Sequence, residues 1–176
     1  QVLFRRLSAF ADSVTFSTLS DVTAALDGPD HPHAASIEET LSHLLDHSLV
    51  RIEIAADGEP RVTMLRTIRD AGREMLTASG EEAATRAVIT RHYQDLVASL
   101  ATSTPVFGGL AHPEVTQRLH RDRPNLIAAV ASLVEAGAMA DAVAMVSGLA
   151  HSWLEAGQLR EGRGWIERTL PFALVA

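Results

Sequence analysis

The first fifty residues carry apolar side chains at helical spacing in three separate stretches. Segments 2–11 and 16–26 each place apolar residues on one stripe of a helix. In the first segment the stripe consists of Val2, Leu3, Leu7 and Phe10, and Arg5 and Arg6 lie off it. Residues 27–35 combine Gly, two Pro and two Asp, which is typical of a loop. A third apolar-periodic stretch opens at Ser36 with a capping-box sequence. The pattern therefore predicts three consecutive helices.

Strand-like alternation follows these helices. Val50, Ile52 and Ile54 alternate with polar or small residues, and an Asp-Gly turn leads into a second alternating run. We predict a β-hairpin of about 50–55 and 60–65, the only β structure of the chain, and then a fourth helix over roughly 66–78. Three helices, a hairpin and a helix are the order of a winged-helix domain, which we expect to span residues 1–79.

The pattern of residues 80–176 predicts helices and no strands. Helical spacing runs from Glu81 to Leu100, returns at about 113–121 and 124–136, and continues in two amphipathic helices split by Gly157. The stretch from 138 to 171 has the length of one tetratricopeptide repeat. The predicted fold is mainly α: a winged-helix domain with one β-hairpin, followed by an α-helical, tetratricopeptide-like region over 80–176 that begins a longer array.

Composition narrows the functional classes. The formal net charge is −7 and neither half of the chain is basic, which weighs against a dedicated nucleic-acid binder. The chain has no cysteine, so disulfides and thiolate metal sites are excluded. We find neither an apolar run long enough for a membrane span nor a signal-peptide pattern, and we expect a cytoplasmic protein. All fifteen basic residues are arginines.

Motifs of catalysis and metal binding are missing or incomplete. Without lysine there is no Walker A loop, and no Gly-x-Ser-x-Gly elbow occurs, so we expect this segment to be no enzyme and to hold no cofactor by itself. His43 and His47 lie at i, i+4, a spacing that can share a metal ion. However, Leu44 stands where the zincin motif requires Glu, and we expect no metal site.

The third predicted helix would be the recognition helix of a DNA-binding winged helix. Its polar positions include Glu38, Glu39 and Asp46, and the wing turn carries Asp57 and Glu59. Carboxylates repel DNA phosphates, so we expect this face to disfavour DNA contact.

Four stretches of the chain resemble consecutive blocks of bacterial STAND-class regulators. They read LFRRLSAFADSVTFSTL, LSHLLDHSLVRI, VTMLRTIRDAGREML and GQLREGRGWIERTL. These regulators are signal-transduction ATPases of the antibiotic-regulator and LuxR-like groups. The resemblance implies an ATPase core outside these residues, with ADP or ATP bound in the full-length protein and the winged helix covering the nucleotide site. It also implies helical repeats that sense a protein partner or a small-molecule signal.

The resemblance points to one candidate site residue. In the eukaryotic relatives the junction between strand and fourth helix carries Met-His-Asp, whose His contacts the β-phosphate of ADP. Here the junction reads Met64-Leu65-Arg66, and the bacterial pattern Met-Leu-Glu-Thr-Ile-Arg is kept except for Arg66. A guanidinium group binds phosphate in bidentate fashion, so Arg66 is a candidate nucleotide-phosphate contact. The alternative is a solvated arginine at the start of a helix.

Two functions remain open at this point. The first is a non-catalytic regulatory fragment of a STAND-type transcriptional regulator, whose partners are the ATPase core of the same chain and a signal bound by the repeats. The alternative is a winged-helix DNA-binding transcription factor with a helical ligand-binding domain.

Overall fold

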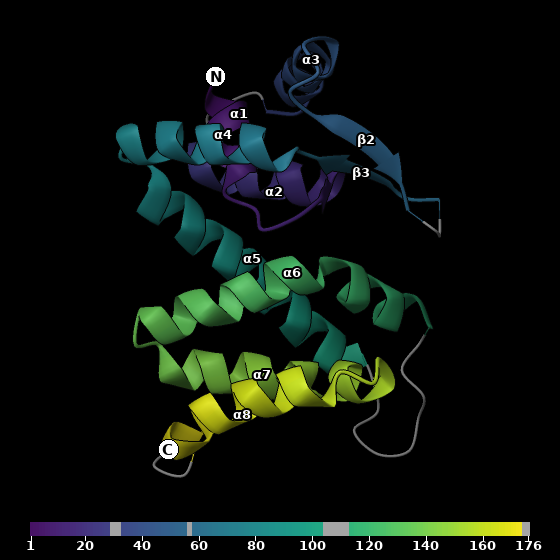
Figure 1. The fold of residues 1–176 in the computed structure, drawn as a ribbon, viewed down its shortest axis with the longest axis vertical. Coiled ribbons are helices and arrows are strands. Elements are labelled where there is room, and N and C mark those ends of the chain that lie inside the picture. The colour runs from purple at the N-terminus through teal and green to yellow at the C-terminus, as the bar shows by residue number, and fades with distance from the viewer. Residues whose placement is uncertain (29–32, 56–57, 104–112, 174–176) are drawn as a thin grey trace. The chain divides into compact units, whose positions relative to one another are not determined.

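The computed structural model describes residues 1–28, 33–55, 58–103 and 113–173 (Figure 1). In chain order the elements are α1 (Val2–Ser8), β1 (Val14–Thr15), α2 (Phe16–Asp27), α3 (His33–Asp46), β2 (Arg51–Ile54), β3 (Pro60–Thr63), α4 (Arg66–Ala78), α5 (Glu82–Ser103), α6 (Pro113–Glu135), α7 (Met139–Glu155) and α8 (Leu159–Ala173). The fold class is as predicted, a mainly helical chain with a winged-helix domain. Two compact units, residues 1–92 and 93–176, divide inside α5. The domain boundary placed between residues 79 and 80 stays a prediction.

The first unit packs four helices around one apolar core. α1 contacts α2, α3 and α4, and α2 also contacts α3. The buried apolar side chains of these helices are Leu3, Phe4, Leu7, Leu19, Val22, Ile37, Leu41, Leu44 and Leu76. The stripe predicted for α1 needs one correction, because Val2 is 42% exposed and Phe4 is buried in its place.

The sheet of the first unit has one strand more than predicted. β2 and β3 form the expected antiparallel hairpin, with Ile52 opposite Val62, and the hairpin extends beyond the helices in Figure 1. The short strand β1 pairs antiparallel with the other edge of β3, so the strand order is β1-β3-β2. Thr15 explains why β1 was missed. It is the last residue of the strand and also the N-cap of α2, where its side chain accepts a hydrogen bond from the Thr18 N–H at 3.1 Å.

α3 ends in a left-handed turn that directs the chain into the hairpin. Ser48 has φ 56°, the Ser48 N–H donates to the Leu45 carbonyl, and the Leu49 N–H donates to the Leu44 carbonyl, each at 2.9 Å. This pair of bonds is the Schellman arrangement that closes many helices. The start of α3 differs from the prediction, since the helix begins at His33 and Ser36 lies within it.

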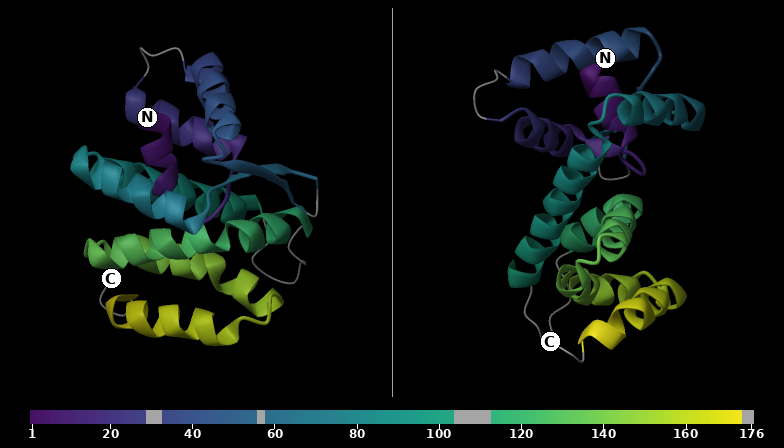
Figure 2. Two further views of the ribbon diagram at one scale, coloured as in Figure 1. Left: turned by 45° about the horizontal axis from the view of Figure 1, so that its top comes forward. Right: turned by 90° about the vertical axis from the view of Figure 1, so that its left-hand side faces the viewer.

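In the second unit, which also contains the end of α5, α7 lies between α6 and α8 (Figure 2). Two glycines allow close approaches to α7. A Cβ added at Gly148 would lie 2.4 Å from the Val97 side chain, and one added at Gly162 would lie 2.9 Å from the Trp153 ring. Small residues at these positions therefore set the spacing of the neighbouring helices.

α6 runs through Pro124 without interruption, where we predicted two helices over 113–121 and 124–136. A proline inside a helix removes one backbone hydrogen bond and crowds the preceding turn, which is why the sequence pattern indicates a break. Leu119 on one side of the proline and Leu126 and Val130 on the other are all buried. Packing of both segments into the same core keeps them in one helix.

Gly72 lets α4 approach α1 closely, and this contact gives a first prediction. A Cβ at residue 72 would lie 2.6 Å from the Ser8 Cβ and 3.0 Å from its Oγ. We expect Gly72→Ala to lower the free energy of unfolding of the first unit by about 1–3 kcal/mol, because the two backbones must move apart. Urea denaturation followed by circular dichroism measures the loss, and amide exchange in α1 and α4 locates it.

Gly164→Ala is the matched control, since Gly164 lies inside α8 with nothing within 4 Å of an added Cβ. That change should leave stability the same or raise it by up to about 1 kcal/mol. Equal effects of the two substitutions would contradict the close approach at Gly72.

Candidate nucleic-acid interface

α3 divides its side chains between the core and the surface. Ile37, Leu41 and Leu44 are buried against the rest of the first unit. From Ile37 to His47, the exposed side chains are all polar and recur along the opposite face: Glu38, Glu39, Ser42, His43, Asp46 and His47. α2 contacts α3, and the connection between the two helices at 29–32 lies outside the described residues. The outer face of α3 is therefore polar, and the buried apolar face opposite it packs the helix against the rest of the first unit.

The polar groups on this face are mostly hydrogen-bond acceptors. Glu38, Glu39 and Asp46 are exposed, as expected from the sequence, and α3 contains no arginine. The Ser42 hydroxyl donates to the Glu38 carbonyl at 3.0 Å, and the His47 Nδ1 lies 2.8 Å from the His43 carbonyl. Of the two acidic residues predicted in the wing turn, Glu59 is partly exposed and Asp57 lies outside the described residues.

Two exposed arginines flank the sheet. Arg51 is the first residue of β2, three residues after the turn at Ser48, and Arg66 is the first residue of α4. Leu65, just before Arg66, is 48% exposed, so both side chains at this junction face outward. Arg66 was the nucleotide-phosphate candidate of the sequence, and its exposure leaves that role an untested prediction.

Three other arginines, on β3 and α4, donate hydrogen bonds to backbone carbonyl groups of the same domain. Arg61 donates to the Ser13 carbonyl at 2.7 Å, Arg69 donates to the Ala11 carbonyl at 2.7 Å, and Arg73 donates to the Ser8 carbonyl at 3.0 Å. Burial lowers the pKa of the Arg69 guanidinium, because the charged form loses contact with water. The sequence pattern did not indicate these contacts, since it treats arginines as surface residues.

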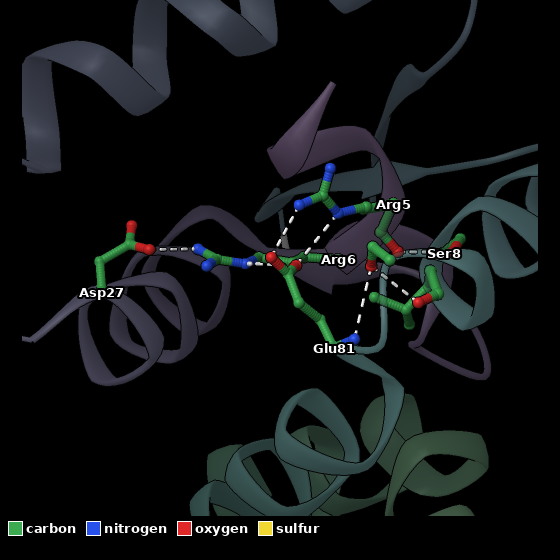
Figure 3. Close-up of polar contacts among 7 residues, drawn as sticks. Arg5, Arg6, Ser8, Asp27 and Glu81 are labelled. Atoms are coloured by element: carbon green, nitrogen blue, oxygen red, sulfur yellow. Dashed lines mark hydrogen bonds and ion pairs between the residues drawn. The ribbon is translucent and has the colours of Figure 1, made fainter.

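A second group of charged residues ties α1 to the end of α2 and to the turn before α5 (Figure 3). Arg5 donates to both carboxylate oxygens of Glu81, at 2.7 and 3.0 Å. Arg6 donates to the Asp27 carboxylate at 2.6 Å. Arg6 was predicted to lie off the buried stripe of α1, but only 8% of it is exposed. Its ion pair with Asp27 accounts for the difference, because a buried charge requires a partner.

The pair His43 and His47 is the remaining candidate site that the sequence analysis considered. No group of three or more His, Cys, Asp or Glu residues lies close enough there to hold a metal ion, which applies to His43 and His47 as well. In the same residues, no helix combines the length and the hydropathy that a membrane crossing requires.

The first unit has a winged-helix fold. Residues 1–77 match the family described as the winged helix-turn-helix domain, in agreement with the helix order and the hairpin. Over 170 residues the chain is 30% identical to proteins provisionally named HTH-type transcriptional regulators, one from Mycobacterium bovis and two from strains of Mycobacterium tuberculosis. The alignment covers 97% of this chain and 18% of each relative, so the chain spans about a fifth of their length. No solved structure matches the chain.

These similarities contradict our expectation that DNA contact is disfavoured. The helix-turn-helix is a DNA-binding architecture, and the relatives are named as transcriptional regulators of that type. The expectation was wrong because it rested only on the numbers of acidic and basic residues. Contact with DNA depends on the few side chains that reach a groove, and a carboxylate on a recognition helix can accept a hydrogen bond from the amino group of cytosine.

The Arg5–Glu81 contact makes the stability of the first unit depend on pH. The hydrogen bonds from Arg5 lower the pKa of Glu81, so the stabilisation is complete above the usual carboxylate range and is lost as the pH falls through the lowered pKa. We expect Glu81→Gln to cost at most about 1 kcal/mol at pH 7, because the pair is partly exposed, and progressively less as the pH falls through the lowered pKa of Glu81. Urea denaturation at several pH values measures the difference.

Glu167→Gln serves as its control. Glu167 pairs with Arg163 on the exposed surface of α8, where solvent screens the charges. This substitution should leave the pH dependence of unfolding unchanged. A constant difference between the wild-type chain and Glu81→Gln from pH 7 to pH 2 would contradict the role of Glu81.

Proposed function

We propose that the winged-helix domain of this chain contacts DNA through α3, as part of a transcriptional regulator. The observation that carries the proposal is the outer face of α3, where five exposed polar side chains between Glu38 and Asp46 lie opposite a buried apolar stripe. The match of residues 1–77 to the winged helix-turn-helix family and the names of the relatives support the same conclusion.

The chemistry of α3 suggests how DNA is read. In helix-turn-helix proteins the second helix enters the major groove and its side chains reach base edges. Carboxylates, hydroxyls and imidazoles on this face form hydrogen bonds with base edges, whereas the absence of arginine from α3 leaves phosphate contact to neighbouring residues. Arg51, exposed at the start of β2, is the nearest such cation along the chain after α3. We therefore expect sequence-dependent binding with a small number of phosphate contacts.

The test is a selection of duplexes from a randomised DNA library by the whole chain, followed by fluorescence anisotropy with the enriched sequence. Replacing Ser42 and His43 together by Ala should weaken binding to the enriched duplex by about tenfold or more, because two groups that face the groove are lost. Affinity should fall only modestly with salt, since few counterions are released.

His151→Ala provides the matched control for this substitution. His151 is an exposed histidine on α7, in the second unit, and its change should leave DNA affinity unchanged. Failure to enrich any sequence, together with no measurable affinity at low salt, would argue against DNA contact by this chain.

We propose a regulatory role for the helical part of the chain, in which it binds a protein partner or a small-molecule signal. The antiparallel pair α7 and α8, joined at Gly157 and packed through Gly162 against Trp153, supports a tetratricopeptide-like repeat. Such repeats stack to form extended binding surfaces, so a repeat in this position suits the recognition of a signal.

A finer proposal is that the chain belongs to a STAND-type ATPase regulator with bound ADP or ATP. Its support is the resemblance at Met64-Leu65-Arg66 and the outward position of Arg66. In a protein that joins these residues to an ATPase core, Arg66→Ala should weaken ADP binding about tenfold, through loss of a bidentate phosphate contact. Isothermal titration measures the affinity.

Arg86→Ala is the control for the nucleotide experiment, because Arg86 is an exposed arginine of α5 that pairs with Glu82. Equal ADP affinities for the wild-type protein and Arg66→Ala would remove the phosphate role. The chain 1–176 alone should bind no nucleotide tightly, since it lacks a phosphate-cradling loop.

A further inference from the structure

β2 is an open edge of the three-stranded sheet. The strand order is β1-β3-β2, and all four residues of β2 are exposed, with Ile52 at 48% and Ile54 at 67%. An edge strand offers unpaired backbone donors and acceptors, and proteins normally protect such edges. Here the edge combines free backbone groups with two exposed isoleucines on one face.

The direction of the free backbone groups follows from the hairpin. The Ala55 N–H donates to the Glu59 carbonyl at 2.9 Å, so in an antiparallel ladder the odd-numbered residues of β2 face β3. Pro60, which has no N–H, pairs with Ile54 at a position that requires none. The N–H and C=O groups of Ile52 and Ile54 therefore point to the open edge.

The side chains of β2 complement a second copy of the same strand. Arg51 and Glu53 project from one face, and Ile52 and Ile54 project from the other, because successive residues alternate. In an antiparallel pairing centred on Ile52, Arg51 of each copy lies opposite Glu53 of the other, and the two Ile52 side chains meet. A pairing centred on Glu53 would place the two Glu53 carboxylates opposite each other, which is unfavourable. Charge therefore selects the first register.

We propose that two copies of this chain associate by antiparallel pairing of their β2 strands, in the register centred on Ile52. The partner is a second copy because the sequence Arg51-Ile52-Glu53-Ile54 is self-complementary in charge and in backbone direction. A two-fold axis passes through the Ile52 pair and makes the interface isologous. The proposal is tested without DNA, because Arg51 is also the residue to which phosphate contact is assigned above.

Charge exchange tests the register. Sedimentation velocity over about a thousandfold concentration range should show a monomer–dimer equilibrium for the wild-type chain. Arg51→Glu alone places two carboxylates opposite each other, and Glu53→Arg alone places two guanidinium groups opposite each other, so each variant should dimerise at least about tenfold more weakly. In an equimolar mixture, the two carboxylates of one variant strand lie opposite the two guanidinium groups of the other. The mixture should therefore recover the wild-type association. This recovery also shows that both variants are folded.

Amide exchange gives a second readout. The Ile52 and Ile54 amides should become protected as the concentration of the wild-type chain rises, because their N–H groups are bonded only in the dimer. Leu159→Ser, on the exposed surface of α8, is the control for association through the helical unit. A wild-type chain that stays monomeric throughout, or a dimer that Leu159→Ser abolishes and the β2 variants leave unchanged, would overturn the proposal.

Discussion

Arginine side chains hold the segment that follows α1, because they donate hydrogen bonds to backbone carbonyl groups at the end of that helix and in the segment itself. Arg61, Arg69 and Arg73 donate to the carbonyls of Ser13, Ala11 and Ser8. These donors come from β3 and α4, so the last elements of the domain hold the segment between its first helix and its first strand. Because an unpaired buried carbonyl costs free energy, the segment has little freedom to lie elsewhere.

The placement of α2 and α3 depends on this arrangement. Holding residues 8–13 against α4 brings Val14 and Thr15 beside β3, where they pair as β1. Thr15 then caps α2, which fixes the start of the helix that packs against α3. The outer face of α3 is thus positioned by contacts made elsewhere in the same domain. The close approach at Gly72 belongs to the same set, since it brings α4 within reach of Ser8.

Periodicity predicted the helices and the hairpin of the first unit because their apolar residues face one core. The residues of β2 and β3 lie within the predicted limits for the same reason. Periodicity could not predict β1, which is too short to alternate, or the burial of Arg6, which depends on Asp27 at the far end of α2. It also overestimated the effect of Pro124, because tertiary packing outweighs a local break. The exposed acidic residues of α3 were predicted correctly. The expectation that they disfavour DNA contact was wrong, because charge alone does not determine contact with bases.

The internal arginine contacts have a practical consequence for chemical probing. The chain contains no lysine, so reagents that acylate or cross-link side-chain amines have no target within these residues. Dicarbonyl reagents, which react with guanidinium groups, would instead distinguish the exposed Arg51 and Arg66 from the hydrogen-bonded Arg61 and Arg69. The order in which arginines are modified is therefore a direct record of whether the end of α1 is still held in place.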